Sequence, residues 1–131
     1  MKKATTINEI SFGIRGAAFK VHSALGPGLF ESVYEKALEI ELQAKEFEIK
    51  SQVVLPVIYK GLNLDAGFRL DILVNDEVIV EIKSVESLSE IHFKQLTTYL
   101  KLTNKKLGLL INFNSISLID KVSFFRIVNN I

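Results

Sequence analysis

Cysteine is absent from this sequence of 131 residues. Disulfide bonds and thiolate zinc sites are therefore excluded, and a reducing compartment such as the cytoplasm, where we expect the protein, is permitted. The two histidines, His22 and His92, lie in unrelated segments without a spaced histidine partner. His92 is the better candidate for a site because it lies one turn before Gln95. Any metal ion must bind to oxygen or to histidine nitrogen.

A long apolar run and a strong excess of one charge are also missing. No apolar segment approaches the roughly 18 residues of a membrane helix. The N-terminus leads into an amphipathic segment rather than a signal-peptide core, so we expect a soluble, unprocessed protein that does not contact a membrane. The formal net charge of +1 lacks the basic excess that marks many nucleic-acid-binding proteins. A hydrophobic content of 48% predicts a compact globular chain.

The first regular element indicated by the sequence is a helix over residues 7–25. Thr6 and Glu9 form a Thr-x-x-Glu capping box, and apolar residues then recur every three to four positions. The helix should end at Gly26-Pro27-Gly28, because proline removes a backbone donor and glycine allows unusual backbone angles.

Two further helices and five strands are expected after this turn. In chain order they are a helix at 31–46, strands at 52–59, 66–74 and 78–83, a helix at 90–102 capped by Ser89, and strands at 107–113 and 122–128. The order α-α-β-β-β-α-β-β predicts an α/β (α+β) fold in one domain over residues 1–131. The first three strands should form an antiparallel meander.

Polar side chains lie on two neighbouring strands of this meander. Because side chains alternate between strand faces, Asp71 points away from the apolar row of Leu70 and Ile72, while Glu81 and Lys83 point the same way as each other. Two carboxylates and a lysine at one end of a sheet suit a hard oxygen site for Mg²⁺ or Mn²⁺, with an ammonium free to position water or phosphate. The alternative is a solvated strand face with mixed charges.

A shared metal restricts how the two strands pair. Asp71 and Glu81 must lie on one face of the sheet, which we expect from direct opposition of the two residues in an antiparallel pair. A three-residue loop at 75–77 gives this register, and so does a β-bulge that places Asp71 and Glu81 on the same face. Its weak point is Glu77, because the third loop position favours a residue that tolerates positive φ. The same register buries four apolar residues together on the other face: Leu70, Ile72, Val80 and Ile82.

The segment Gly28-Leu29-Phe30-Glu31-Ser32-Val33-Tyr34 resembles the bacterial GxxExxY proteins, which belong to the PD-(D/E)XK nuclease superfamily. The resemblance continues in order through nearly the whole chain, at Tyr59-Lys60-Gly61, Phe68-Arg69-Leu70-Asp71, Val80-Glu81-Ile82-Lys83, Gln95-Leu96-Thr97-Thr98-Tyr99-Leu100 and Gly108-Leu109-Leu110-Ile111-Asn112-Phe113. It implies a restriction-endonuclease-like core, in which helices flank a mixed five-stranded sheet. Leu70 stands where the superfamily label has proline, a common substitution that leaves the ligand set unchanged.

The resemblance also implies the catalytic residues. In the superfamily an acidic residue on a helix joins an Asp and a Glu-x-Lys on adjacent strands, and Glu31, Asp71, Glu81 and Lys83 match these places. The first three would bind Mg²⁺ or Mn²⁺. Lys83 would stabilise developing charge or position the nucleophile.

Four further residues are candidates for contact with the substrate or support of the site. Gln95 and Tyr99 are four apart on one helix face and match the Gln-x-x-x-Tyr element of the RecB-like branch, although an amphipathic helix with a boundary Gln and a half-buried Tyr also explains them. Tyr34, one turn after Glu31, could orient a carboxylate or fill the core. Arg69 could bind a phosphate or pair with a neighbouring acid.

We therefore expect a metal-dependent endo- or exodeoxyribonuclease, with DNA as the substrate because of the superfamily. No base-reading element is evident in the sequence. The alternative is a non-catalytic module that keeps the fold and binds nucleic acid or a protein. The near-neutral charge and small size favour this alternative, and the presence of all four catalytic residues favours the enzyme. A homodimer or larger assembly could supply a DNA-clamping surface.

Overall fold

The computed structural model describes residues 6–64 and 67–130. In chain order the elements are α1 (Ile7–Leu25), α2 (Glu31–Ala44), β1 (Ile49–Val54), β2 (Ile58–Tyr59), β3 (Leu62–Asn63), β4 (Arg69–Val74), β5 (Val78–Lys83), α3 (Glu90–Thr103), β6 (Leu107–Asn112) and β7 (Phe124–Val128). The expected mixed α/β fold with a five-stranded sheet is confirmed. None of the helices in the described ranges is long and apolar enough to cross a membrane.

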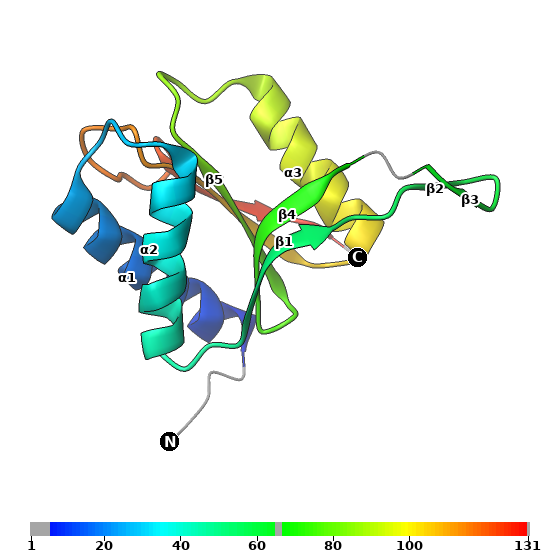
Figure 1. Ribbon diagram of the computed structural model, residues 1–131, viewed down its shortest axis with the longest axis horizontal. Coiled ribbons are helices and arrows are strands. Elements are labelled where there is room, and N and C mark those ends of the chain that lie inside the picture. The colour runs from blue at the N-terminus through cyan, green and yellow to red at the C-terminus, as the bar shows by residue number, and fades with distance from the viewer. Residues whose placement is uncertain (1–5, 65–66, 131) are drawn as a thin grey trace.

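The main sheet has the strand order β1-β4-β5-β6-β7. Neighbouring strands are antiparallel except β5 and β6, which run parallel and are connected through α3. Strands β1, β4 and β5 form the expected meander. The central pair β5 and β6 is almost entirely buried, as parallel strands covered on both faces must be. Figure 1 shows α1 and α2 on one side of the sheet and α3 on the other.

Two apolar clusters fill the space between the sheet and these helices. Ile72, Val80 and Ile82 pack with α1 and α2. Leu70 instead packs with α3 and with Leu73 and Ile79. The prediction that Leu70 shares a face with Ile72 is therefore wrong. The regular alternation fails because the strand pairing is interrupted between these two residues, as the next paragraph describes.

Strand β4 is irregular at Asp71. On the β1 side the register pairs Ser51 with Ile72 and Val53 with Leu70, but the intervening Gln52 has a φ of 51° and makes no regular pair with Asp71. On the β5 side regular pairing also ends at Ile72. The alternation of side chains is interrupted at this unpaired residue, and Leu70 and Ile72 lie in different layers.

The loop between β4 and β5 has the register that the sequence predicts. Val74 pairs with Val78 across residues 75–77. The positive φ values fall on Asn75 (52°) and Asp76 (57°), two residue types that tolerate them. Glu77 is spared this conformation, and its N–H donates to the Val74 carbonyl at 3.0 Å. Glu77 therefore does not need the positive φ expected at the third loop position.

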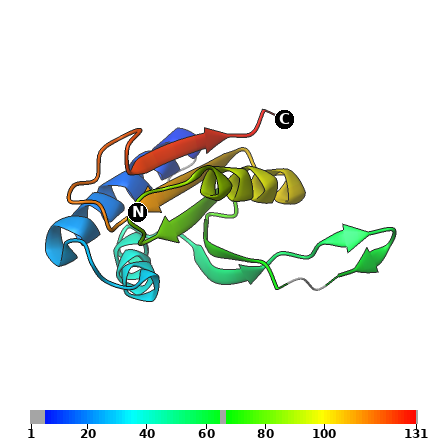
Figure 2. The same cartoon turned by 90° about the horizontal axis from the view of Figure 1, so that it is seen from above.

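The expected single strand at 52–59 is wrong. The chain forms β1 from Ile49 to Val54 and then a separate hairpin of β2 and β3. Pro56 explains the break, because proline cannot donate a ladder hydrogen bond. Lys60 (φ 51°) and Gly61 (φ 78°) make the turn between β2 and β3. Figures 1 and 2 show this hairpin projecting from the body of the molecule, and we call residues 56–64 the arm.

Smaller differences concern element ends. Helix α2 stops at Ala44 rather than at 46, because Glu46 adopts a φ of 65° and turns the chain. The expected strand at 66–74 begins at Arg69, and its expected first residue lies outside the described residues. Strands β6 and β7 are one and two residues shorter than the expected 107–113 and 122–128.

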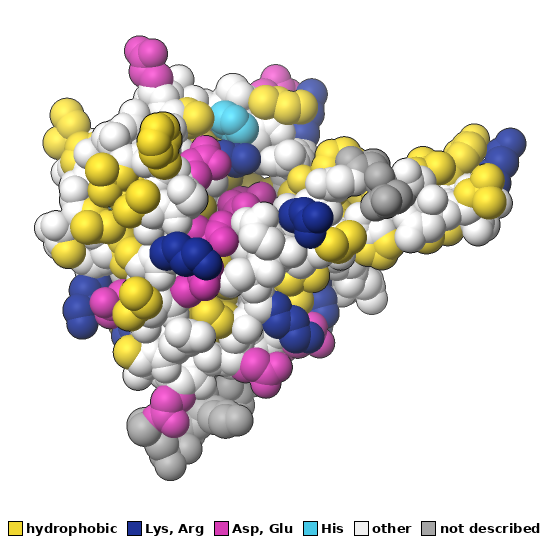
Figure 3. Space-filling model, viewed as in Figure 1, with side chains coloured by type: hydrophobic (Ala, Val, Ile, Leu, Met, Phe, Trp, Pro, Cys, Tyr) yellow, Lys and Arg dark blue, Asp and Glu magenta, His cyan; other side chains and the backbone are white. Residues whose placement is uncertain are grey.

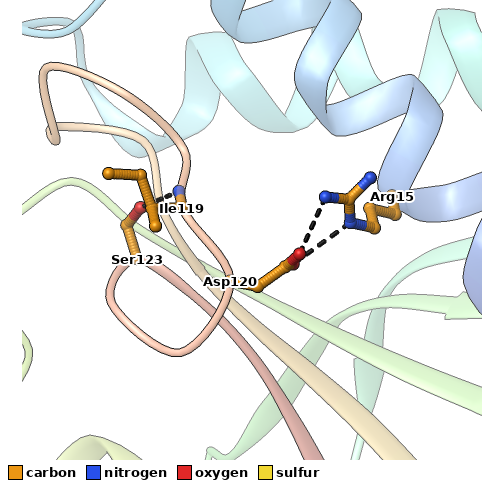
Figure 4. Close-up of polar contacts among 4 residues, drawn as sticks. All are labelled: Arg15, Ile119, Asp120 and Ser123. Atoms are coloured by element: carbon orange, nitrogen blue, oxygen red, sulfur yellow. Dashed lines mark hydrogen bonds and ion pairs between the residues drawn. The ribbon is translucent and has the colours of Figure 1, made fainter.

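The connection between β6 and β7 is fastened to α1 (Figure 4). The Arg15 guanidinium donates to both carboxylate oxygens of Asp120, at 3.1 and 2.8 Å. Within the connection, the Ile119 N–H donates to the Ser123 hydroxyl at 2.9 Å. These contacts hold the loop at the β7 edge of the sheet.

Candidate functional site

Strands β4 and β5 separate where the candidate acids lie. Their last regular pair is Ile72 with Val80. Beyond it, the Asp71 N–H donates to Glu81 Oε2 at 2.9 Å and the Ile82 N–H donates to Asp71 Oδ2 at 2.8 Å. Each carboxylate thus takes the place of a backbone carbonyl in the ladder. The structure therefore brings Asp71 and Glu81 together in the gap between the two strands, which we call the fork.

The two acids are in an environment that disfavours their negative charge. Glu81 is only 3% exposed. Burial, followed by the nearby Asp71 charge, raises the pKa of Glu81 to about 8. Burial also raises the pKa of Asp71, against the opposing effects of the Ile82 N–H and the Lys83 charge. At neutral pH the metal-free fork therefore favours a protonated Glu81 over two adjacent carboxylates.

Lys83 and helix α3 form the opposite wall of the fork. The Lys83 ammonium donates to Gln95 Oε1 at 3.4 Å, and its charge lowers the pKa of both Asp71 and Glu81. Tyr99 is 5% exposed, and its pKa is raised by burial and then by the charges of Glu81 and Asp71. Gln95 therefore lies beside Lys83, and Tyr99 lies close enough to the candidate acids for their charges to raise its pKa.

Glu31 reaches the fork from the other layer of the molecule. It is the first residue of α2, and its Oε2 accepts from the Ser84 N–H at 3.2 Å. The Ser84 hydroxyl donates to the Leu29 carbonyl at 2.6 Å. These bonds hold the start of α2 against the end of β5. The Glu31 charge contributes to the raised pKa of Asp71, although Glu31 is itself exposed.

Tyr34 is placed in the core rather than at the fork. It is fully buried and stacks on Phe113 with ring centroids 4.7 Å apart. Its hydroxyl donates to the Gly26 carbonyl and accepts from the Leu29 N–H at 3.1 Å. The tyrosine thus fastens the turn between α1 and α2, and so positions Glu31 indirectly.

The remaining candidates have no direct contact with the acids. Arg69 is exposed and has no hydrogen-bond or ion-pair partner among the residues described. His22 is buried, and its Nε2 lies 2.7 Å from the Ser115 carbonyl. His92 Nδ1 accepts from the Ser89 N–H at 3.0 Å, so this ring caps α3.

Glu35 is a site residue that sequence reasoning missed. Its Oε1 accepts from Gln52 Nε2 at 2.8 Å, and the same amide nitrogen lies 3.5 Å from Asp71 Oδ1. Burial, followed by the Asp71 charge, raises the pKa of Glu35 to about 7. A signal was available, because Glu35 lies four residues after Glu31 and therefore on the same helix face. Figure 3 shows acidic side chains gathered in the middle of this side of the molecule, next to α2.

Asn112 is a second missed residue, and it acts on the backbone. It is 3% exposed at the end of β6. Its side chain accepts from the Val85 N–H at 3.1 Å and donates to the Val85 carbonyl at 3.0 Å. It therefore fixes the chain directly after Lys83 and Ser84. A polar residue that ends an otherwise apolar strand was the available signal.

The residues of the fork fit a divalent cation. No three Asp, Glu or His side chains within residues 6–64 and 67–130 form a ready-made metal cluster. Mg²⁺, however, is commonly bound by one or two carboxylates and keeps several waters. The buried pair of Asp71 and Glu81 supplies that number of carboxylates. A cation would also favour the charged form of both carboxylates, against the burial and mutual repulsion that raise their pKa values.

Comparison with known proteins identifies one family. A family model described as the PD-(D/E)XK nuclease superfamily matches residues 8–124. The matched range contains both strands of the fork, the start of α2 and all of α3. Comparisons with curated proteins and with solved structures found no match.

Proposed function

The chain belongs to the PD-(D/E)XK nuclease superfamily, and on that premise we propose that it is a Mg²⁺- or Mn²⁺-dependent nuclease that cleaves DNA. The observation that supports this most is the fork, where Asp71 and Glu81 meet beside Lys83. We also propose that the chain is one nuclease domain of the GxxExxY branch, on the strength of the segment from Gly28 to Tyr34.

The proposed roles follow from the geometry. Asp71 and Glu81 would hold the cation, and Glu31 and Glu35, which interact electrostatically with Asp71, would add ligands directly or through water. When bound, a divalent ion supplies activation of water and neutralisation of charge on the phosphate. The two backbone N–H groups that now bind the carboxylates keep them oriented toward the fork.

Lys83 is the residue placed to act on the substrate itself. Its ammonium has one hydrogen-bond partner among the described residues, Gln95, at the long distance of 3.4 Å. The remaining donors can therefore reach a phosphate oxygen or a water. Gln95 would orient the Lys83 ammonium and Tyr99 would support the α3 side of the fork. The exposed Arg69 would contact a more distant phosphate.

A nuclease assay in the presence of Mg²⁺, Mn²⁺, Ca²⁺ or EDTA tests this proposal, with single-stranded DNA, duplex DNA and RNA as substrates. We expect cleavage of DNA with Mg²⁺ or Mn²⁺ and little with Ca²⁺. Lys83→Ala should lower the rate by about 10²- to 10³-fold, the usual loss for one group that stabilises transition-state charge. Lys20→Ala is the matched control, because Lys20 is on α1 and its exposed side chain pairs with Glu41 at 3.3 Å.

Calorimetry with Mn²⁺ separates the enzyme from the non-catalytic alternative. The wild type should bind weakly, and an Asp71→Asn, Glu81→Gln double variant should not bind. Equal Mn²⁺ binding by both proteins would remove the fork from the proposal. Normal Mn²⁺ binding without cleavage of any substrate would instead favour a module that retains the fold and binds nucleic acid.

A further inference from the structure

The arm exposes apolar side chains far from the core. Ile58 is 59% exposed, Tyr59 60% and Leu62 67%. Within residues 6–64 and 67–130, strands β2 and β3 form a separate two-stranded sheet by pairing with each other. An isolated two-stranded hairpin is marginally stable in water. Figures 1 and 3 show the arm projecting from the body with hydrophobic side chains along it, so a partner surface would stabilise it.

A recessed apolar surface lies at the base of the arm, on the outer face of α3. Phe68, Ile91 and Leu102 line it and are 43%, 65% and 51% exposed. They surround a cavity of about 270 Å³ that Gln95 and Tyr99 also line. We call this surface the α3 groove. The chain thus carries one projecting and one recessed apolar surface.

The charges on both surfaces argue against nucleic acid as the occupant. Lys60 is the only charged residue in the segment from 54 to 64. Among the described residues that line the α3 groove, Lys94 is the only charged one, and it pairs with Glu90 at 3.3 Å. Binding to a phosphate backbone relies on several cationic contacts. An apolar protein surface is the better match.

A second copy of this chain meets these requirements. In a two-fold dimer each copy presents the same patch, so the patch must contain both complementary surfaces. At roughly 200 Å² for a fully exposed large side chain, complete burial of the exposed parts of the six apolar side chains on the arm and in the α3 groove would remove roughly 700 Å² per copy from water. This is close to the approximately 800 Å² per partner of a stable complex. We propose that two copies form a two-fold dimer in which the arm of each lies in the α3 groove of the other.

The proposed dimer would affect the fork. Gln95 lines the α3 groove and also accepts the hydrogen bond from Lys83. The arm of the partner would therefore cover the side of the site at which Gln95 lies. Two forks would be held at a fixed separation, which suits a substrate with two strands. The dimer itself does not depend on the proposed nuclease activity.

Sedimentation velocity over a range of protein concentrations tests the dimer. The wild type should sediment as a dimer, whereas Leu62→Glu on the arm and Ile91→Glu in the α3 groove should each give monomers. Phe12→Glu is the matched control, because Phe12 is 78% exposed on α1, and this variant should stay dimeric. Circular dichroism checks that each variant is folded. A monomeric wild type, or dimers that survive both charged variants, would overturn the proposal.

Cross-linking tests the pairing even if a charged variant fails to fold. The chain has no cysteine, so single cysteines can be introduced cleanly. A copy with Leu62→Cys, mixed with a copy with Leu102→Cys, should form a mixed disulfide more readily than either forms one with itself. Preferential cross-linking of the arm to another arm would contradict the proposed geometry. If the wild type is itself monomeric and Leu62→Glu loses DNA binding, the arm contacts nucleic acid and the dimer is overturned.

Discussion

Glu81 is buried where its charged form is unfavourable unless a positive charge lies beside it. Its side chain is 3% exposed, and Lys83 is the nearby cation that lowers its pKa. The net result is still a pKa of about 8. A buried acid with a perturbed pKa is a common mark of a functional site. The raised pKa of Glu81 also affects the stability of the protein, which can be measured without a substrate.

Glu81 should make the metal-free protein less stable as the pH rises. The unfolded pKa is 4.5 and the folded pKa about 8, so between these values the folded state binds a proton that the unfolded chain has released. The contribution to stability is complete below pH 4.5 and is lost as the pH rises through about 8. Glu81→Gln removes this loss and keeps the acceptor for the Asp71 N–H. In EDTA the variant should therefore melt at a higher temperature than the wild type at pH 8.5, and the difference should shrink towards pH 5.

Thermal denaturation of both proteins across this pH range provides the measurement. At about 1.4 kcal/mol per pKa unit, the effect at high pH is on the order of a few kcal/mol. In saturating Mn²⁺ the wild type should melt at a higher temperature than Glu81→Gln, because only the wild type retains the Glu81 carboxylate as a ligand. A constant difference between the two proteins at every pH would show that Glu81 is not protonated in the folded state.

Glu35 should set the pH at which the metal binds. A cation must displace the protons on Glu35 and Glu81, whose pKa values are about 7 and about 8, so Mn²⁺ affinity should rise between pH 6 and 9. Glu35→Gln removes a negative charge that raises the pKa of Glu81, and its amide oxygen can still accept from Gln52. The rise in Mn²⁺ affinity should therefore occur at lower pH in Glu35→Gln than in the wild type.

Calorimetric titrations at several pH values distinguish two roles for Glu35. If it acts only through the pKa of Glu81, the variant and the wild type should bind Mn²⁺ equally at pH 9. A weaker variant at pH 9 would identify Glu35 as a direct ligand. Glu46→Gln is a suitable control, because Glu46 is exposed beyond the end of α2.

At the scale of the elements, α3 packs on β6 without spare room at Gly108. A Cβ at this position would lie 2.8 and 2.9 Å from Leu96 Cδ1 and Cγ. Gly108→Ala should therefore destabilise the protein by about 1–3 kcal/mol, as overpacking of a core does. Gly16→Ala is the control, since its nearest contact is Lys45 Nζ at 3.9 Å and it lies within α1. That change should stabilise by about 0.5–1 kcal/mol. Urea denaturation measures both, and an unchanged midpoint for Gly108→Ala would mean that the helix can shift away from the strand.

The sequence predicted elements well where local signals agreed with tertiary packing. The Thr6 and Glu9 capping box and the glycine after Leu25 placed α1 at its observed bounds. The register of β4 and β5 followed from the requirement that Asp71 and Glu81 meet. The arm was missed because β-branched residues on both sides of Pro56 suggested one strand, and the proline was given too little weight.

The site was harder to predict where it depends on contacts between layers. The position of Leu70 could not be read from alternation, because β4 is unpaired on both sides at Asp71. Glu35 enters the site only because Gln52, on a different element, bridges it to Asp71. Asn112 acts through the backbone of Val85, a contact that no spacing along the chain reveals.

For the molecule as a whole, the net charge of +1 limits how it can bind nucleic acid. Affinity should depend on a few local cations rather than on a basic surface, so its salt dependence should be shallow. Arg69→Ala should reduce the slope of log affinity against log salt by about 0.9, the amount expected for one phosphate contact. Fluorescence anisotropy with labelled DNA in Ca²⁺ measures this slope without cleavage. Lys121→Ala, in the exposed β6–β7 connection, should leave it unchanged.

The separation of β4 from β5 also provides a spectroscopic reporter. The amide protons of Asp71 and Ile82 are bonded to side-chain carboxylates rather than to backbone carbonyls. When those carboxylates bind a cation, they become weaker acceptors for the two protons, while the amides of the paired residues Ile72 and Val80 are not affected in this way. In nuclear magnetic resonance the two fork amides should therefore show altered chemical shifts and faster solvent exchange on addition of Mg²⁺, so the occupancy of the site can be followed without substrate or turnover.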